Sequence, residues 1–347
     1  RGVGRGGTRE DELLGFWFEK STKIHTVQGD LETSPLIGEK IVVECVVTLV
    51  APTLGGFFMQ EEDADRDANS ATSEGVFVAV SVSADGLDIF EGDVMRVLGT
   101  VAETFGRTQI EAALISTSCT TDKVSEVELA LPLAAEFDLE SIENMLVGNT
   151  DTWFVTDLAS YVRFGELVVS AEVLFTPTHL FAAGSAEAIA LVDKNSRNKI
   201  IVDDLTNGTP ESLDLPIGGF DATNPIRIGD SLTSVTGVID YDFGNYRIRP
   251  VITPILEQTN FRTDAPELKE GNLKVASFNV LNLFNGDGLG NNIASGRGAK
   301  TQQEYALQLL KITNAIIAID ADVIGLMEIE NDGYNELSSI AQLVDSI

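Results

Sequence analysis

The first third of the chain is a series of short apolar segments separated by glycine and aspartate. Residues 38–50, GEKIVVECVVTLV, are followed by GGFFMQ, GVFVAVSV, GDVMRVLGTVAETFG and RTQIEAALIS. Their alternation of apolar and polar positions predicts about five strands and no long helix. A small closed antiparallel barrel is the simplest arrangement for such strands, because closure leaves no exposed sheet edge.

The same pattern returns in the middle of the chain. EGDVMRVLGTVAETFGRTQI aligns with IGDSLTSVTGVIDYDFGNYRI when one residue is inserted, and GEKIVVECVV has a counterpart in GELVVSAEVL. The aligned pairs are Gly92 and Gly229, Asp93 and Asp230, Gly99 and Gly237, Phe105-Gly106 and Phe243-Gly244, and Ile110 and Ile248. We therefore expect two tandem copies of one β-barrel module, residues 24–122 and 150–258. The alternative is that glycine-aspartate hairpins resemble each other in any β protein.

Segments of a different character surround these two copies. Residues 1–23 are expected to form an N-terminal extension, and 123–149 a connecting segment with a short helix over 139–146 that Asp138 caps. Residues 259–272 are polar, contain a proline and have the composition of a linker.

Residues 273–347 change to a β-α-β pattern. LKVASFNVLNLF predicts a strand, residues 285–298 a Gly/Asn-rich loop, and ADVIGLMEI a second strand. Between them lies a helix whose apolar face is formed by Tyr305, Leu309, Ile312, Ile316 and Ile319. A helical crossover joins parallel strands, so polar residues at the two strand ends converge on one rim of the sheet.

The residues expected at this rim are Asn279, Asn282, Glu328 and Glu330. Carboxylate and carboxamide oxygens suit a hard cation such as Mg²⁺ or Mn²⁺. The other interpretation is that polar residues simply end strands.

The charge balance limits the partners of this chain. With 54 acidic and 23 basic residues the net charge is −31, so any contact with nucleic acid must be local or assisted by a metal ion. Simple solubility explains such a surface equally well. No apolar run approaches the roughly 18 residues of a membrane span, and the start of the chain lacks the order of a signal peptide.

Cysteine and histidine are scarce. Cys45 and Cys119 exclude a disulfide framework and a thiolate metal cluster, while one disulfide or two buried thiols both remain consistent with the sequence. His25 and His179 exclude a histidine-rich zinc site, and both are interpreted as structural or exposed.

An acidic loop in the first copy, QEEDADRDANSATSEG, is a candidate calcium site. Asp63, Asp65 and Asp67 alternate, and Glu74 follows after a turn, a spacing related to calcium-binding loops although the offsets of an EF-hand are not met. The sequence predicts a Ca²⁺-stiffened loop, against the alternative of a solvated acidic hairpin.

The motifs ASFNVLNLF, RGA, QLLKITNAI and DADVIGLMEIENDGY together resemble the start of the endonuclease/exonuclease/phosphatase superfamily, specifically secreted bacterial nucleases similar to extracellular DNases of marine γ-proteobacteria. The resemblance implies that 273–347 is the first β-α-β portion of an α/β sandwich. It makes Asn279 a catalytic residue that orients phosphate or metal, and Glu328 a ligand of Mg²⁺ or Mn²⁺. Arg297, Glu330 and Asn331 match residues that are characteristic of this subgroup. Arg297 and the strand-end residue Asn282 are expected to bind substrate.

Upstream, TVQGDLETSPLIGEKIVVECVVTLV looks like the OB-fold module that precedes the catalytic domain in those nucleases, with Cys45 in place of a usual glycine. In OB folds, aromatic and basic side chains bind single strands. Candidates for such contacts are Phe57, Phe58, Phe77 and Phe105 in the first copy, and Tyr241, Phe243, Tyr246, Arg247 and Arg249 in the second. Aromatic residues at strand positions are alternatively core residues.

The expected architecture is thus mainly β, with two tandem OB-like barrels followed by part of an α/β sandwich. The expected function is a metal-dependent extracellular nuclease that hydrolyses DNA or RNA, present without the second half of its catalytic domain and with an uncovered sheet face. Secretion follows from the resemblance alone, and no oligomeric state is indicated. The alternative is a non-catalytic OB-fold scaffold, binding nucleic acid or protein, with an incomplete catalytic remnant.

Overall fold

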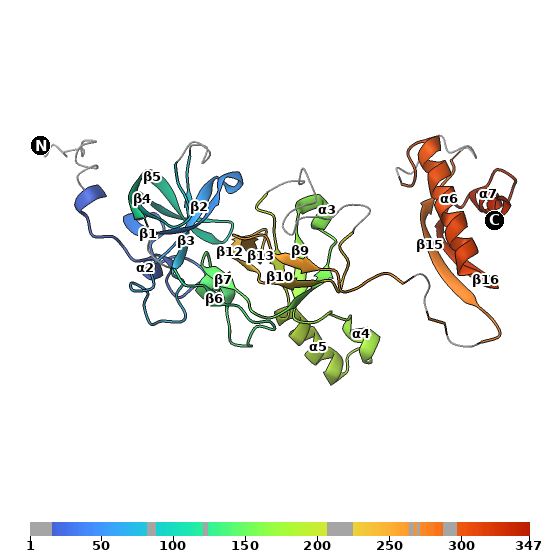
Figure 1. Cartoon of the computed structure of the whole chain (residues 1–347), viewed down its shortest axis with the longest axis horizontal. Helices are drawn as coiled ribbons and strands as arrows, with labels where there is room; N and C mark the ends of the chain where they lie inside the picture. The colour runs from blue at the N-terminus through green and yellow to red at the C-terminus, as the bar shows by residue number, and fades with distance from the viewer. Residues whose placement is uncertain are drawn as a thin grey trace, which may run out of the picture. The chain divides into compact units, whose positions relative to one another are not determined.

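A computed structural model describes residues 16–81, 88–120, 124–206, 225–263, 267–268, 271–286 and 297–347. The chain is mainly β, with several sheets (Figure 1). It divides into two compact units, Arg1–Arg262 and Thr263–Ile347, which are described separately. The first unit contains both expected copies, and the division falls within the expected linker.

The first copy is a closed barrel. Its strands are β1 (Lys40–Ala51), β2 (Gly56–Gln60), β3 (Gly75–Ala79), β4 (Asp93–Thr104) and β5 (Arg107–Thr120). They close in the order β1-β2-β3-β5-β4, with β3 parallel to β5 and the other pairs antiparallel. The short helix α2 (Ile24–Gln28) inserts Ile24 and Val27 into the core, where Cys45 is a buried free thiol. The expected closed barrel is confirmed, while the Cys119 side chain lies outside the described residues.

The second copy differs from the expected closed barrel. Its strands are β8 (Trp153–Asp157), β9 (Leu167–Ser170), β10 (Ile200–Val202), β11 (Ser231–Thr233), β12 (Thr236–Asp242) and β13 (Asn245–Pro250), with β6 (Val127–Glu128), β7 (Leu146–Gly148) and β14 (Ile255–Glu257) at the edges. Together they form one nine-stranded sheet in the order β14-β11-β8-β9-β10-β13-β12-β7-β6. The helices are α3 (Tyr161–Phe164), α4 (Pro177–Leu180) and α5 (Ala186–Arg197).

The connectivity of the first copy is nevertheless visible in this sheet. The run β8-β9-β10-β13-β12 repeats the order of β1-β2-β3-β5-β4, and β10 is parallel to β13 as β3 is to β5. The counterpart of β4 is divided at Ser234, whose φ is 57°. Its first part, β11, pairs with β8, and its second part, β12, pairs with β13.

The aligned positions of the two copies have matching local geometry. A Cβ on Gly99 would lie 2.4 Å from an Ile110 methyl, and one on Gly237 would lie 2.6 Å from an Ile248 methyl. The hairpin tips also match, because Phe105 and Phe243 have φ of 55° and 49° and each precedes a glycine with positive φ. The shared sequence pattern therefore has a shared steric cause.

The connecting segment packs the copies together. Asp138 caps a 3₁₀ turn, η3 (Leu139–Ile142), by accepting from the Glu140 N–H at 3.1 Å. The turn is shorter than the helix predicted over 139–146, because Asn144 takes a left-handed φ of 61° and Leu146 already begins β7. A separate apolar cluster joins residues of both copies: Leu49, Ala51, Phe58, Phe77 and Val238.

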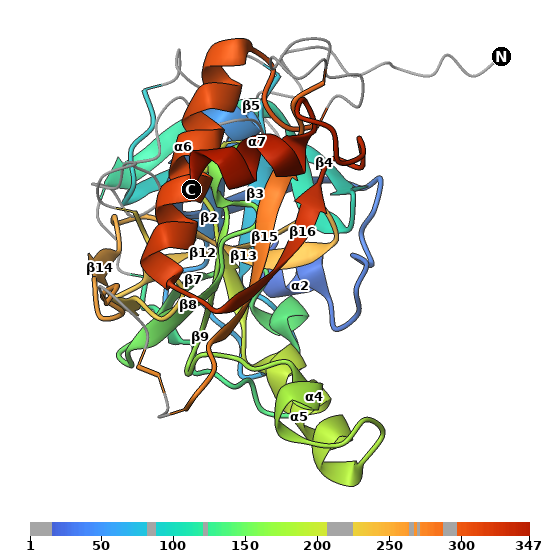
Figure 2. The same ribbon diagram turned by 90° about the vertical axis from the view of Figure 1, so that its right-hand side faces the viewer.

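The smaller unit is the expected β-α-β arrangement. Strands β15 (Val275–Leu283) and β16 (Val323–Ile329) pair in parallel and are joined by α6 (Gln302–Ile319), with α7 (Ser339–Ser346) following. Figures 1 and 2 show α6 alongside the strand pair. Its core contains Tyr305 and Ile312 of α6 with Val280 and Leu283 of β15.

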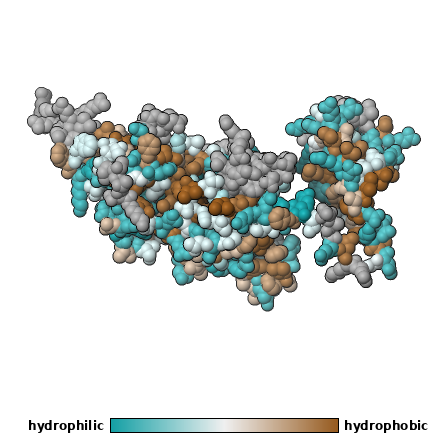
Figure 3. Space-filling view, viewed as in Figure 1, coloured by the Kyte–Doolittle hydropathy of each residue, from teal (hydrophilic) through white to brown (hydrophobic). Residues whose placement is uncertain are grey.

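The opposite face of this strand pair is uncovered. Exposed apolar side chains on this face are those of Val275, Val323 and Met327, and Figure 3 shows apolar surface on this unit. In the described part of the chain, no helix is long and apolar enough to cross a membrane.

Candidate metal site at the end of the parallel strands

Both parallel strands depart from regular geometry at their carboxyl ends. The register runs evenly to the pair Asn279 and Met327, and then shifts to the pair Leu283 and Ile329. Between these two pairs β15 advances by four residues, whereas β16 advances by two. This irregularity interrupts the alternation of side chains along β15. Leu281 and Asn282 consequently both line a pocket to which α6 contributes Gln308.

Backbone strain is concentrated in the same interval. Leu281, Asn282 and Glu328 have φ of 53°, 54° and 62°. Asn282 directly precedes Leu283, and Glu328 directly precedes its partner Ile329, so the two polar residues occupy equivalent positions on neighbouring strands. The structure thus brings Asn282 and Glu328 to one rim, with Asn279 one register step earlier.

The side chains at this rim differ in their hydrogen bonds. Asn279 accepts from the Leu281 N–H through Oδ1 at 2.8 Å, which supports the irregular backbone. Among the described residues, the side chains of Asn282 and Glu328 have no hydrogen-bond or ion-pair partner. Glu328 is also exposed, so its carboxylate is available to a ligand.

Glu330 has a structural role that the sequence did not indicate. Its Oε2 accepts from the Asn285 N–H at 2.7 Å, the Gly286 N–H at 3.0 Å and the Ser339 hydroxyl at 3.3 Å. These bonds connect the end of β15 with the start of α7. The carboxylate is therefore engaged, unlike that of Glu328.

Arg297 lies beside the rim in the sequence motif RGA. It is exposed, and the following Gly298 is close to Asn282, because a Cβ on Gly298 would lie 2.6 Å from the Asn282 carbonyl oxygen. Asn282, Gly298 and Lys311 help to line an open pocket of about 470 Å³. Most of the predicted loop at 285–298 lies outside the described residues.

The four predicted calcium ligands are not brought together. Asp63 accepts from the Ser125 N–H at 2.9 Å, and Asp65 forms an ion pair with Lys23. Burial and these acidic partners act on Lys23 in opposite directions, and its pKa is raised. Only Asp67 and Glu74 remain close, since the Asp67 N–H donates to Glu74 Oε1 at 2.6 Å. Partners from elsewhere in the chain thus separate these carboxylates, and calcium binding by this loop stays a prediction.

Burial contradicts the predicted binding role of Arg247, while that of Tyr246 stays a prediction. Arg247 is 1% exposed and pairs with Glu166 at 2.5 Å and Asp203 at 2.6 Å. Tyr246 packs against the core and donates to Glu140 at 2.5 Å. Burial and this hydrogen bond to an acid raise the pKa of Tyr246. The Arg247 side chain is therefore inaccessible to a nucleic acid, whereas that of Tyr246 is half-buried.

The aromatic candidates separate into core and surface residues. Phe57, Phe58 and Phe77 are fully buried, whereas Phe105 and Phe243 are 87% and 71% exposed at the two equivalent hairpin tips. The sequence pattern around the glycines indicated the hairpins, but it did not separate these two classes.

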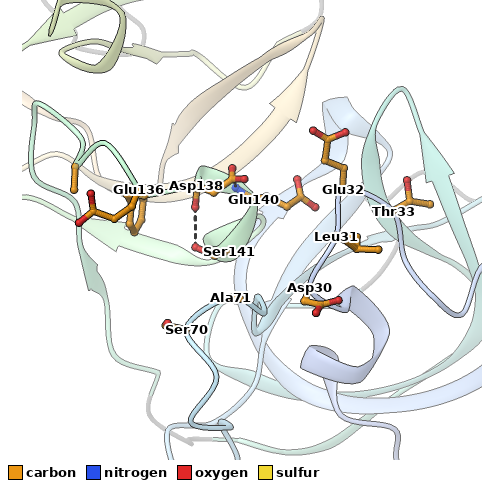
Figure 4. A pocket seen from close by; sticks show the side chains of 12 residues that line it. Asp30, Leu31, Glu32, Thr33, Ser70, Ala71, Glu136, Asp138, Glu140 and Ser141 are labelled. Carbon is orange, nitrogen blue, oxygen red and sulfur yellow. Dashed lines mark hydrogen bonds between the residues drawn. The ribbon is translucent and has the colours of Figure 1, made fainter. Parts of the chain in front are cut away.

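Another pocket, of about 860 Å³, is strongly acidic. Its lining includes Asp30, Glu32, Glu136, Asp138 and Glu140 (Figure 4). Burial is the main cause that raises the pKa of Glu140, and the neighbouring carboxylates add to it. Such a lining repels phosphate, so this pocket is unsuitable for a nucleic acid backbone.

Comparison with known proteins gives limited matches. A family model described as a domain of unknown function (DUF8508) matches residues 109–259, less than half of the chain, from β5 through the second copy. No curated protein matches. Among solved structures, a deletion mutant of the single-stranded DNA binding protein from Thermus aquaticus is 13% identical, with 66% of this chain and 99% of that chain covered and a TM-score of 0.16. A TM-score this low does not establish a shared fold.

Proposed function

We propose that the rim formed by Asn279, Asn282 and Glu328 binds a divalent cation for phosphodiester hydrolysis, and that the protein is a metal-dependent nuclease. The observation that carries this proposal is the left-handed backbone at Leu281, Asn282 and Glu328. Each such residue other than glycine costs about 1–3 kcal/mol, and this strain is typically found where function requires a particular side-chain position.

The available donors fit a hard cation. Mg²⁺ and Mn²⁺ prefer carboxylate and carbonyl oxygens and usually keep several waters. Glu328 offers an exposed carboxylate without a partner, and Asn282 offers a carboxamide without a partner among the described residues. Glu328 would hold the ion, with Asn282 beside it.

The rim residues and the ion would have different roles toward the phosphate. A bound ion supplies Lewis acid chemistry, which polarises a phosphate and stabilises negative charge on a leaving oxygen. Asn279 orients the phosphate next to the ion, and Arg297 contributes a guanidinium that can form two hydrogen bonds with phosphate oxygens. The net charge of −31 makes such local positive charge necessary for binding a polyanion.

Mn²⁺ binding followed by electron paramagnetic resonance tests this proposal. The whole chain is compared with Glu328→Gln and with the control Glu336→Gln, which removes an exposed carboxylate from the same unit. We expect Glu328→Gln alone to lose a Mn²⁺ site for which Mg²⁺ competes. Unchanged Mn²⁺ binding by this variant would refute the assignment of Glu328.

Nicking of supercoiled plasmid by the same proteins tests the reaction. We expect cleavage that depends on Mg²⁺ and falls by about 100-fold or more in Glu328→Gln, the scale on which loss of one charge-stabilising group acts. Equal cleavage by the parent chain and Glu328→Gln would contradict hydrolysis at this rim.

A second candidate function is single-strand binding by the two hairpin tips. The first copy is a closed barrel of five strands, and in the five-stranded OB fold the loop between the fourth and fifth strands binds oligonucleotides. Phe105 and Phe243 are exposed at this loop in each copy. Stacking on an aromatic ring contributes about 1–3 kcal/mol per base.

Fluorescence anisotropy with a labelled single-stranded oligonucleotide tests this second function. The double variant Phe105→Ala with Phe243→Ala should bind at least about tenfold more weakly, since each lost stacking contact costs about 1–3 kcal/mol. Phe181→Ala, at an exposed aromatic residue just after α4, is the control. Equal binding by the double variant would show that the tips do not contact the strand.

A further inference from the structure

Three potential metal ligands that are distant in sequence meet beside the first barrel. His25 lies on α2, Asp67 in the acidic loop, and Glu74 directly before β3. One ligand atom from each lies within 4.8 Å of the others. His25 Nδ1 is 3.1 Å from Glu74 Oε2 and 3.3 Å from Glu74 Oε1.

Glu74 is a buried carboxylate that has no partner from lysine or arginine. It is 3% exposed, and it accepts one backbone hydrogen bond, from Asp67. Among the described residues, neither Glu74 nor Asp67 forms an ion pair with lysine or arginine. A buried carboxylate requires a compensating positive charge, and His25 or a bound cation is the available source.

The neighbouring acidic group shows the contrast. Glu61, Glu62 and Asp65 also lie within one ion's reach of each other, but the Lys23 ammonium is already there, 3.0 Å from Glu61. Among the described residues, no lysine or arginine pairs with the carboxylates of the group that contains His25. Two of its members, Asp67 and Glu74, line an open pocket of about 320 Å³ whose lining also includes Arg66.

We propose that His25, Asp67 and Glu74 together bind one transition-metal ion, with Zn²⁺ as the preferred species. One imidazole nitrogen and two carboxylate oxygens are ligands typical of Zn²⁺, and the adjoining pocket leaves room for water at the remaining position. Ca²⁺ prefers oxygen ligands alone, so the histidine changes the expected metal. The ion would fasten α2 to the loop before β3.

Zn²⁺ titration by isothermal calorimetry tests this site on the whole, chelator-stripped chain. All proteins in this experiment also carry Glu328→Gln as a common background, so that a metal ion bound at the rim of the parallel strands does not contribute to the signal. We expect one Zn²⁺ per chain and at least about 100-fold weaker binding in His25→Gln, because loss of even an outer hydrogen-bond partner weakens a metal site about 10–100-fold. The matched control is His179→Gln, which changes the other histidine of the chain and should bind as the background does.

A second readout reports the ligands directly. Co²⁺ in the same site should give visible absorption bands that disappear in His25→Gln and persist in His179→Gln. Circular dichroism verifies folding, and Asp67→Asn, at an exposed loop position, replaces His25→Gln if that variant does not fold. Unaltered Zn²⁺ binding by the ligand variant, absence of saturable Zn²⁺ binding, or binding of Ca²⁺ in preference to Zn²⁺ would each overturn the proposal.

Discussion

Arg249 in the second copy connects three acidic side chains in the interior, and its removal gives a sharp test of the structure. It is fully buried and donates to Asp203, to Asp240 at 3.0 Å and to Asp242 at 3.5 Å. Removing one partner of a buried ion pair costs about 3–5 kcal/mol. Asp203 keeps Arg247 at 2.6 Å, and Asp240 keeps Arg107 at 3.0 Å. We therefore expect Arg249→Leu to lose about 3 kcal/mol, the lower end of that range.

Urea unfolding followed by tryptophan fluorescence measures this loss. Trp153 is fully buried in the second copy, and the smaller unit contains no tryptophan, so the signal reports the first unit. Lys194→Ala is the control, because its ion pair with Glu172 is exposed and such pairs contribute about 0–1 kcal/mol. A loss in Arg249→Leu no larger than that of the control would refute the reasoning.

The pH dependence of Arg249→Leu provides an independent check. Burial raises the pKa of Asp203, while Arg249 and Arg247 lower it. Without Arg249 the pKa of Asp203 in the folded protein rises further, which favours the protonated acid. Stability from a raised carboxyl pKa is present at low pH and is lost as pH rises. The difference between Arg249→Leu and the parent should therefore be larger at pH 7 than at pH 5.

Three further predictions follow from single contacts. Burial raises the pKa of Glu143 well above its usual range. The folded protein therefore loses stability as pH rises above about 4.3, the pKa of an unperturbed glutamate. In urea unfolding, Glu143→Gln should be more stable than the parent at pH 7, and this difference should shrink at pH 4. Gly99→Ala and Gly237→Ala should each cost about 1–3 kcal/mol in thermal unfolding, because the added methyl overlaps an isoleucine, whereas Gly325→Ala, whose nearest neighbour is 3.9 Å away, should cost little. Glu330→Ala should destabilise the smaller unit by about 1–3 kcal/mol and speed hydrogen exchange at the two loop amides that it binds, because these are left without a partner.

The strands of the first barrel and the β-α-β unit were predictable because their causes are local. Gly99 and Gly237 are required where strands approach closely, so the repeated pattern reports real geometry. The helix over 302–319 followed from its apolar period in the same way. The division of the second copy's fourth strand at Ser234 has no comparable sequence signal, and the closed barrel expected there was wrong.

The candidate sites show the opposite limit of sequence reasoning. The sequence identifies the carboxylates of the acidic loop from their spacing. It does not identify their hydrogen-bond and ion-pair partners, because these come from other parts of the chain. Lys23 forms an ion pair with Asp65, and Ser125 donates a hydrogen bond to Asp63. His25 contacts Glu74, which is 49 residues away in the sequence. The positive φ of Glu328 likewise has no signal in the sequence.

The distribution of arginine explains why the proposed sites depend on metal ions. Arg96, Arg107, Arg247 and Arg249 are largely buried and form ion pairs with Glu44, Asp240 and Asp203, among others. These arginines are engaged in ion pairs and do not offer their charge at the protein surface. The chain as a whole has a net charge of −31. A phosphodiester approaching such a surface is repelled unless positive charge is supplied locally. On our proposal a divalent cation held by Glu328 would supply this charge, so the acidity of the protein and its proposed nuclease function are consistent with each other.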